Sequence, residues 1–376
     1  MSCLGNSIIG ALEESLVKRV IRRKDLFRYG SDCRESFCLS FENWVNRLIP
    51  RSHSLLVPSA SVGLDLLLEI LCPRPKPRVL TLPIGWVAIY SAVIRYGGSL
   101  YFALLDDLFT VNIANLEEIL EDQKIDVIII PHLLGRAISN IDEITAVAER
   151  YKVSLIEDIA QSFGVKHPKG YVGSFGRAAY TSFNHHKTIS CGDGGLVLFK
   201  NYAEFENCWM LHDQGCLFSG SKRKVSESNF IPGNSLRMNE LSGAILTGQS
   251  CRLAYIKAKV AAIRSEFDKR LSELGVKIVE ASSGEIAFTS IFENNHKFEL
   301  PTLEESGWHV YWNIPYKNLS LNSEARAKTR EILRRYSMLG CGFVDKYYST
   351  PFGLELSCES DKINECVEMI ISKITL

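Results

Sequence analysis

Short apolar runs recur through residues 54–199 and are separated by segments of about ten residues with helical patterning. The apolar runs predict strands at 54–57, 79–82, 99–103, 126–130, 153–157, 178–183 and 195–199. Strands that are apolar along their whole length are typical of parallel sheets covered by helices, because neither face of such a sheet meets water. The alternation therefore predicts an α/β protein whose mostly parallel sheet is sandwiched by helices.

The pattern changes after a long helix that we predict from residue 237 to residue 274. The elements expected beyond this helix are short strands and helices, at 277–280, 286–291, 309–314, 325–336 and 361–373. We predict two domains: residues 1–255, an N-terminal helix and the large domain, and residues 256–376, a smaller C-terminal α+β domain. The polar segment 213–232 predicts an irregular loop.

Charge and cysteine usage exclude several classes of function. Lys+Arg and Asp+Glu both number 43, so no net field attracts nucleic acid or anionic lipid. No apolar run approaches the roughly 20 residues that a membrane span needs. The eleven cysteines include no Cys-x-x-Cys pair, which argues against a zinc site and favours reduced thiols. We expect a cytoplasmic protein with no metal, no nucleic-acid partner and no membrane span.

An aspartate and a lysine stand near the ends of two predicted strands. Asp158 follows the strand 153–157, and Lys187 lies on the connection after the strand 178–183. Ligands of parallel sheets collect at the carboxyl ends of the strands. A Schiff base requires a lysine amine that can lose its proton, and pyridoxal phosphate also requires an acidic partner for its ring nitrogen. Phosphate donors and a ring cover are offered by Ser59, Ala60, Ser61, Ser182 and Trp86.

Most of these residues also have an ordinary structural interpretation. Ser59 or Ser61 fits an N-cap of the following helix as well as it fits an anion site at the helix start. Trp86 fits core packing, and His132 fits a hydrogen-bonded buried histidine. The basic segment 22–30 fits either a solvated helix end with a glycine stop or a strap near an anionic ligand.

Three stretches in the middle of the chain resemble a known family: I-E-D-I-A-Q-S-F-G at 156–164, V-G-S-F-G-R-A-A-Y-T-S-F-N-H-H-K at 172–187 and G-D-G-G at 192–195. The family is DegT/DnrJ/EryC1/StrS, whose members are fold-type-I, pyridoxal-phosphate-dependent aminotransferases best known for acting on nucleotide-linked keto-sugars. The likeness extends to S-A-S-V-G-L-D-L-L-L, L-P-I-G-W-V-A, I-I-I-P-H-L-L-G-R-A-I-S-N-I-D-E-I and G-N-S-L-R-M-N-E-L-S-G-A-I. It covers roughly residues 20–265 and implies an aspartate-aminotransferase-like fold.

The resemblance implies a role for each matching residue at the cofactor ring. Lys187 forms the Schiff base with pyridoxal phosphate and later shuttles protons. Asp158 pairs with the pyridine nitrogen, Gln161 hydrogen-bonds the ring hydroxyl, and Trp86 stacks on the ring.

The phosphate site is where the chain departs from the family pattern. The resemblance implies that Ser182 and the Ala60-Ser61 turn hold the phosphate, although Gly-Thr is usual in place of Ala-Ser. Alanine fits there unless the backbone needs a positive φ. The family forms homodimers with shared active sites, in which Asn234 would reach the partner's phosphate. Asn234 stands three residues before Arg237 instead of the usual two, which weakens that assignment.

Two histidines precede the lysine, and some relatives that carry histidine in place of the lysine are sugar dehydratases. Ser182 and Lys187 are five residues apart, as are Lys187 and Gly192, and both spacings match the lysine-bearing enzymes. The register therefore assigns the catalytic position to Lys187. His185 and His186 are expected to pack in the cofactor loop or to contact the substrate.

The resulting hypothesis is a homodimeric aminotransferase that moves an amino group from an amino acid, glutamate in the first instance, to a nucleotide-linked keto-sugar. Its product would serve amino-sugar, surface-polysaccharide or natural-product biosynthesis. Residues that could contact the acceptor, each fitting a surface or core position equally well, are Arg28, Tyr29, His132, His185, Lys222, Arg223 and Trp312. A sugar dehydratase and a non-catalytic regulatory relative remain as alternatives.

Overall fold

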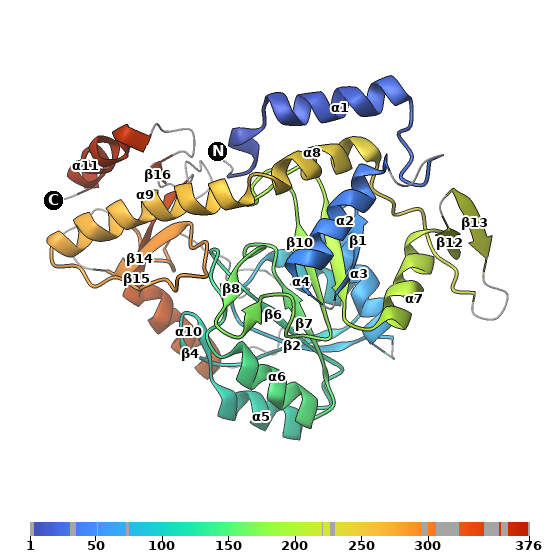
Figure 1. Cartoon of the computed structure of the whole chain (residues 1–376). Helices are drawn as coiled ribbons and strands as arrows, with labels where there is room; N and C mark the ends of the chain where they lie inside the picture. The colour runs from blue at the N-terminus through green and yellow to red at the C-terminus, as the bar shows by residue number, and fades with distance from the viewer. Residues whose placement is uncertain are drawn as a thin grey trace.

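The computed structural model describes residues 4–30, 35–50, 52–72, 75–219, 221–225, 230–294, 300–305, 323–341, 353–354 and 360–374. Its centre is a seven-stranded sheet with the strand order β1-β11-β10-β7-β6-β2-β3 (Figure 1). The strands are β1 (His53–Val57), β2 (Arg78–Thr81), β3 (Ser99–Phe102), β6 (Val127–Pro131), β7 (Ser154–Asp158), β10 (Ala178–Ser182) and β11 (Gly195–Phe199). Strands β3, β2, β6, β7 and β10 are parallel, whereas β11 is antiparallel to both of its neighbours. The predicted, mostly parallel sheet is confirmed.

Helices cover both faces of this sheet. Successive side chains of a strand point to opposite faces, and because both faces are apolar here, each is buried by helices. In β1, Leu55 and Val57 join one apolar cluster, whereas Leu56 joins the other. The first cluster packs beneath helices α3 (Ala60–Leu71), α4 (Val87–Arg95) and α7 (Tyr202–His212). The second packs beneath α2 (Phe37–Leu48), α5 (Ile113–Asp122) and α6 (Ile141–Arg150). This is the sandwich that the apolar strands predict.

The N-terminal helix lies against a helix from the middle of the chain. Helix α1 (Ala11–Arg23) packs on α8 (Glu240–Ser250), as Figure 1 shows at the top of the molecule. The single helix predicted over 237–274 is instead two helices, α8 and α9 (Leu253–Glu273). Arg252 lies at the break, and its guanidinium bonds the Glu13 carboxylate and the Ile8 carbonyl. The break between the two helices therefore coincides with the residue, Arg252, whose side chain bonds the N-terminal segment.

In the described part of the chain, three short antiparallel strand pairs lie in the segments that connect the elements of the large domain. The segment predicted as an irregular loop, 213–232, contains the hairpin β12 (Cys216–Ser219) and β13 (Lys222–Val225), so that prediction is wrong for these residues. Two smaller pairs are β4 (Leu105–Asp107) with β5 (Thr110–Val111), and β8 (Lys166–His167) with β9 (Gly170–Tyr171).

The C-terminal part is a mixed α+β unit. Its sheet is β14 (Thr289–Glu293), β15 (Tyr336–Cys341) and β16 (Gly353–Leu354), flanked by α9, α10 (Ser323–Arg335) and α11 (Ile363–Ile374). The predicted strand 277–280 is reduced to an isolated bridge between Ile278 and Phe292, and the predicted strand 309–314 lies outside the described residues. The domain boundary predicted at 255/256 falls in the first turn of α9, and one apolar cluster continues across it.

In the described ranges, no helix combines the length and the apolar character that a bilayer crossing requires.

Candidate active site

A cavity of about 220 Å³ opens at the carboxyl ends of β6, β7 and β10. This is the edge where parallel sheets bind ligands. The cavity gathers residues from several separate stretches of sequence, including most of those that the sequence predicted for the site. The predicted residues that line it are Ser59, Ala60, Ser61, Trp86, His132, Asp158, Gln161, Ser182 and Lys187.

Asp158 ends β7 with its carboxylate in the cavity, although only 6% of the residue is exposed. Its Oδ1 accepts the Ala160 N–H over 2.9 Å, and its Oδ2 accepts the Tyr180 hydroxyl over 2.8 Å. Burial raises the pKa of Asp158 above its ordinary value, while these two hydrogen bonds and the charge of Lys187 oppose the rise. The carboxylate is thus oriented and desolvated, which suits it to pair with a positive group in the cavity.

Lys187 lies on the loop between β10 and β11, which backbone hydrogen bonds from the loop itself and from the N-terminal segment hold in place. Its N–H donates to the Asn184 carbonyl over 3.1 Å, and its carbonyl accepts the N–H of Gly5 over 3.0 Å. Burial lowers the pKa of the Lys187 amine, and Asp158 partly opposes this effect. Within the described residues, its Nζ forms neither a hydrogen bond nor an ion pair. An unpaired amine with a lowered pKa is the nucleophile that a Schiff base requires.

The start of α3 provides the anion-binding end of the cavity. Ser59 caps the helix by accepting the Val62 N–H at its Oγ over 3.2 Å, which decides that Ser59 rather than Ser61 is the N-cap. The N–H groups of Ala60 and Ser61 then remain at the positive end of the helix. Ala60 is helical and has no positive φ, so alanine fits where glycine is usual in the family.

A contact that requires glycine and a buried serine shape one wall of the cavity. A Cβ on Gly195 would lie 2.4 Å from the carbonyl carbon of Ser59, so only glycine lets β11 begin so close to the start of α3. Ser182, at the end of β10, is buried at the same edge, and its Oγ accepts the Asn184 N–H over 3.3 Å. The G-D-G-G cluster therefore brings the phosphate turn and the lysine loop together.

Gln161 is anchored by the loop that follows β6. Its Oε1 accepts the Leu134 N–H over 3.0 Å, and its carbonyl accepts the Gly135 N–H over 3.0 Å. Leu134 and Gly135 both have positive φ, +56° and +71°, which turns their N–H groups toward Gln161. Because Oε1 is occupied, the amide NH2 is the group that Gln161 can donate to a ligand.

His132 lines the same cavity but uses both ring nitrogens for structure. Its Nδ1 accepts the Ile138 N–H over 3.0 Å, so the proton is on Nε2, which donates to Glu157 over 3.1 Å. Glu157 is fully buried and also accepts three backbone N–H groups between residues 173 and 176. His132 is therefore a structural wall of the cavity, as the ordinary interpretation of a hydrogen-bonded buried histidine predicts.

Trp86 stands at the mouth of the cavity, immediately before α4. It is 48% exposed and lines the cavity, which excludes core packing as its main role. The lining also includes residues for which the sequence analysis assigned no role, namely Tyr180, Asn184 and Asp193. The period of two in β10 places Tyr180 on the same face as Ser182, which is a signal that could have found it.

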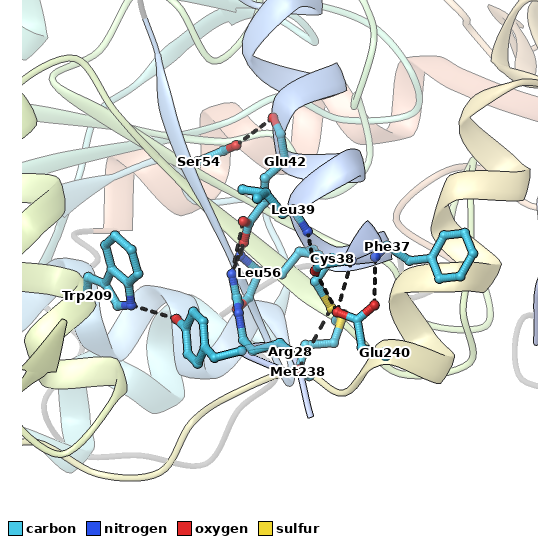
Figure 2. A network of polar contacts seen from close by, with 12 residues as sticks. Arg28, Phe37, Cys38, Leu39, Glu42, Ser54, Leu56, Trp209, Met238 and Glu240 are labelled. Carbon is cyan, nitrogen blue, oxygen red and sulfur yellow. Dashed lines mark hydrogen bonds and ion pairs between the residues drawn. The ribbon is translucent and has the colours of Figure 1, made fainter. Parts of the chain in front are cut away.

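Arg28 and Tyr29 do not line this cavity; both are buried, as the core alternative that the sequence left open for them predicts. Arg28 is 5% exposed and donates to both oxygens of Glu42 over 2.7 and 2.9 Å and to the Leu56 carbonyl over 3.2 Å (Figure 2). Tyr29 is buried, and its ring stacks on Phe218 with centroids 4.0 Å apart. Both side chains are engaged in internal contacts. Arg28 is therefore neither part of a solvated helix end nor part of a strap near a ligand, the two interpretations that the sequence offered for the basic segment.

The other residues named for the substrate lie elsewhere. His185 is exposed beside His186, with ring centroids 5.2 Å apart, and does not line the cavity. Asn234 is exposed, and its backbone N–H donates to the Leu211 carbonyl over 2.8 Å. Lys222 and Arg223 are exposed on β13. Trp312 lies outside the described residues.

The burial of Arg28 gives a first prediction, that Arg28→Met lowers stability and spares the cavity. The variant leaves the Glu42 carboxylate buried without its cation, so we expect the free energy of unfolding to fall by about 3–5 kcal/mol in urea titrations. The double variant Arg28→Met/Glu42→Leu should recover much of this loss, because it buries no charge. A single variant as stable as the wild type would contradict the structural assignment.

Fold and cavity together define a class: an α/β protein whose mostly parallel sheet carries a lysine of lowered pKa, a buried aspartate and a helix N-terminus at one edge. The model of the DegT/DnrJ/EryC1/StrS aminotransferase family matches residues 9–301, and the chain belongs to this family. The resemblance found in the sequence is thereby confirmed, and with it the assignment of the chain as an aminotransferase.

Solved structures of similar fold cover nearly the whole chain. Helicobacter pylori PseC, an aminotransferase involved in the biosynthesis of pseudoaminic acid, matches with TM-score 0.72 at 16% identity over 99% of each chain. A protein described as a sugar aminotransferase from Streptococcus pneumoniae, solved in PLP form, matches with TM-score 0.73 at 16% identity over 97% of this chain and 96% of its own. The GDP-4-keto-6-deoxymannose-3-dehydratase ColD matches with TM-score 0.72 at 16% identity over 98% and 100%. These similarities confirm the predicted fold class.

Proposed function

We propose that this chain is a pyridoxal-phosphate-dependent sugar aminotransferase. The observation that carries the proposal is the single cavity in which Lys187, Asp158 and the start of α3 meet. The three are spaced along the sequence but converge on one sheet edge. They provide an amine, a carboxylate and an anion site, which are the groups that pyridoxal phosphate requires.

The residues present fit this cofactor. The Lys187 amine has no hydrogen-bond or ion-pair partner among the described residues, and burial lowers its pKa. Asp158 would hold the ring nitrogen, and the Gln161 NH2 would donate to the ring hydroxyl. Ser182 and the N–H groups of Ala60 and Ser61 would hold the phosphate. When bound, pyridoxal phosphate supplies an electron sink that stabilises negative charge beside the amino-bearing carbon.

The chain's own residues would control the proton transfers of the reaction. Lys187 is the base and acid that we assign to the cavity, since burial lowers its pKa and so makes the uncharged amine easier to form. Asp158 keeps negative charge at the far end of the ring site, and the exposed indole of Trp86 would cover the ring face against water. We assign His132 no part in these transfers, because both of its ring nitrogens are engaged by Glu157 and Ile138.

For the finer identity of the substrates, the family supports a proposal. We propose glutamate as the amino donor and a nucleotide-linked keto-sugar as the acceptor, in line with the sugar aminotransferases among the similar structures. We also propose a cytoplasmic homodimer in which the exposed Asn234 reaches the partner's phosphate site, and the basic residues of β13 and His185 are available for acceptor contacts. The free cysteines among the described residues agree with a reducing compartment.

A dehydratase is the second candidate, because the fold also matches that of a sugar dehydratase. The position that distinguishes the two is Lys187. The lysine faces the cavity, whereas His185 and His186 are exposed and do not line it. An amine in that place favours amino-group transfer over dehydration.

The direct test is optical and needs no acceptor. The purified protein with pyridoxal phosphate should absorb visible light, and glutamate should bleach this band as the amino group moves to the cofactor. Incubation with ¹⁵N-glutamate and a panel of keto-sugars, followed by mass spectrometry, should then give a labelled amino-sugar. A deoxygenated product without label would favour the dehydratase, and no response to any amino donor would favour the regulatory alternative.

A further inference from the structure

Tyr180 lies beside Asp158 on the neighbouring strand of the central sheet. Strands β10 and β7 are parallel, and their register sets Tyr180 directly against Asp158. Tyr180 is 1% exposed, lines the cavity and donates its hydroxyl proton to Asp158 Oδ2 over 2.8 Å. The Tyr180 hydroxyl and the Asp158 carboxylate are therefore hydrogen-bonded to each other at the wall of the cavity, where the bond can influence a ligand of Asp158.

The two oxygens of Asp158 are held by partners of different kinds. The Ala160 N–H fixes Oδ1 from the turn that follows β7, and it would remain in any side-chain variant. Tyr180 fixes Oδ2 from another strand, and it is the side-chain donor among the hydrogen bonds of Asp158 in the described residues. The orientation of the carboxylate plane therefore depends on this hydroxyl.

The charged and titratable groups around Asp158 come from three elements. Lys187 approaches from the loop after β10, and His132 from the end of β6, where its Nε2–H is committed to Glu157. Burial raises the pKa of Asp158, and the causes that oppose the rise are, first, the Ala160 N–H, then the Tyr180 hydroxyl and the charge of Lys187. Removal of the hydroxyl would leave a carboxylate that is equally buried but less stabilised in its charged form.

We propose that Tyr180 is a positioning residue for the cofactor, which acts through Asp158 by fixing its second oxygen and keeping the carboxylate anionic. The inference rests on the proposed function, since Asp158 is the residue that would hold the ring nitrogen of pyridoxal phosphate. It assigns a functional role to a tyrosine that strand packing alone would also explain.

The test is Tyr180→Phe, which keeps the ring and removes the hydroxyl. Titration of the apoprotein with pyridoxal phosphate should show an affinity about ten- to a hundred-fold lower than that of the wild type. In the loaded protein, the pH midpoint of the visible absorption should move upward by about one unit. A less anionic Asp158 leaves the ring less positive, which raises the proton affinity of the nitrogen that joins Lys187 to the cofactor.

Tyr151→Phe is the matched control, because it also removes a hydroxyl bonded to a carboxylate, that of Glu121, on the surface between α6 and α5. It should leave both the affinity and the midpoint unchanged. The Asp158→Asn background separates positioning from packing: there, Tyr180→Phe should cause little further loss, whereas an undiminished loss would overturn the proposal. Should Tyr180→Phe fail to fold, 3-fluorotyrosine at position 180, a stronger donor, should move the midpoint downward, and an unmoved midpoint would count against the proposal.

The outcomes distinguish this inference from the function on which it rests. A wild-type protein that binds no pyridoxal phosphate overturns the proposed function and the role of Tyr180 together. A wild-type protein that binds the cofactor, with a Tyr180→Phe variant of equal affinity and equal midpoint, overturns the role of Tyr180 alone.

Discussion

Replacement of Lys187 by alanine is expected to abolish amino transfer, with a loss of rate on the order of 10⁴-fold or more. In the proposed function, Lys187 is both the nucleophile that would link the cofactor to the chain and the group that would move protons at the reacting carbon, and the variant removes both roles. Borohydride reduction of the loaded wild type, followed by peptide mapping, should place the cofactor on Lys187. A mapped label on any other lysine would contradict the site.

The control for this variant is Lys200→Met. Lys200 is also a lysine whose pKa is lowered by burial, but its amine donates to the Phe175 carbonyl over 2.7 Å, away from the cavity. Its replacement should leave the rate and the visible absorption within a few-fold of the wild type. Equal losses in both variants would mean that the effect of Lys187→Ala comes from the fold and not from the chemistry.

The apoprotein offers a second measurement on Lys187 that needs no turnover. The pKa of Lys187 is lower in the folded chain than its ordinary value of 10.5, so folding is opposed by protonation of the amine. Its contribution to stability is present above that value and is lost as the pH falls through the folded-state pKa. Apo Lys187→Met should lack this dependence and be more stable than apo wild type at neutral pH, as expected where function requires a destabilised site.

The local sequence predicted the strands and the residues that follow them. Each apolar run between residues 54 and 199 became a strand within a few residues of its expected ends, because burial on both faces requires uninterrupted apolar side chains. For the same reason the site could be anticipated at Asp158 and Lys187, which interrupt or follow such runs. The elements that failed depend on distant partners. Helix α8 ends just before Arg252, which bonds Glu13 in the N-terminal helix, far away in the sequence.

The order of the strands in the sheet could not be derived from the sequence. Contacts between neighbouring strands depend on that order, so the sequence analysis missed residues whose role comes from such contacts. Tyr180 contacts Asp158 only because β10 lies next to β7, and the antiparallel β11 separates β10 from β1. Arg28 looked like a surface cation because nothing local indicates that Glu42 is buried beside it. Strand β13 is exposed and mostly basic, with no alternation of apolar and polar residues. The sequence therefore did not predict that it pairs with β12.

The charge of Asp158 is the last point on which the site depends, and Asp158→Asn tests it. Asparagine has the same size and can still bond the Tyr180 hydroxyl and the ring nitrogen, but it carries no charge. Loss of one partner from a buried ion pair costs about 3–5 kcal/mol, so we expect kcat/KM to fall roughly 10²- to 10⁴-fold. Asp142→Asn, which removes a surface carboxylate paired with Lys169, should have little effect. If Asp158→Asn kept near-wild-type activity, shape rather than charge would hold the ring, and Tyr180 would have no electrostatic role to perform through Asp158.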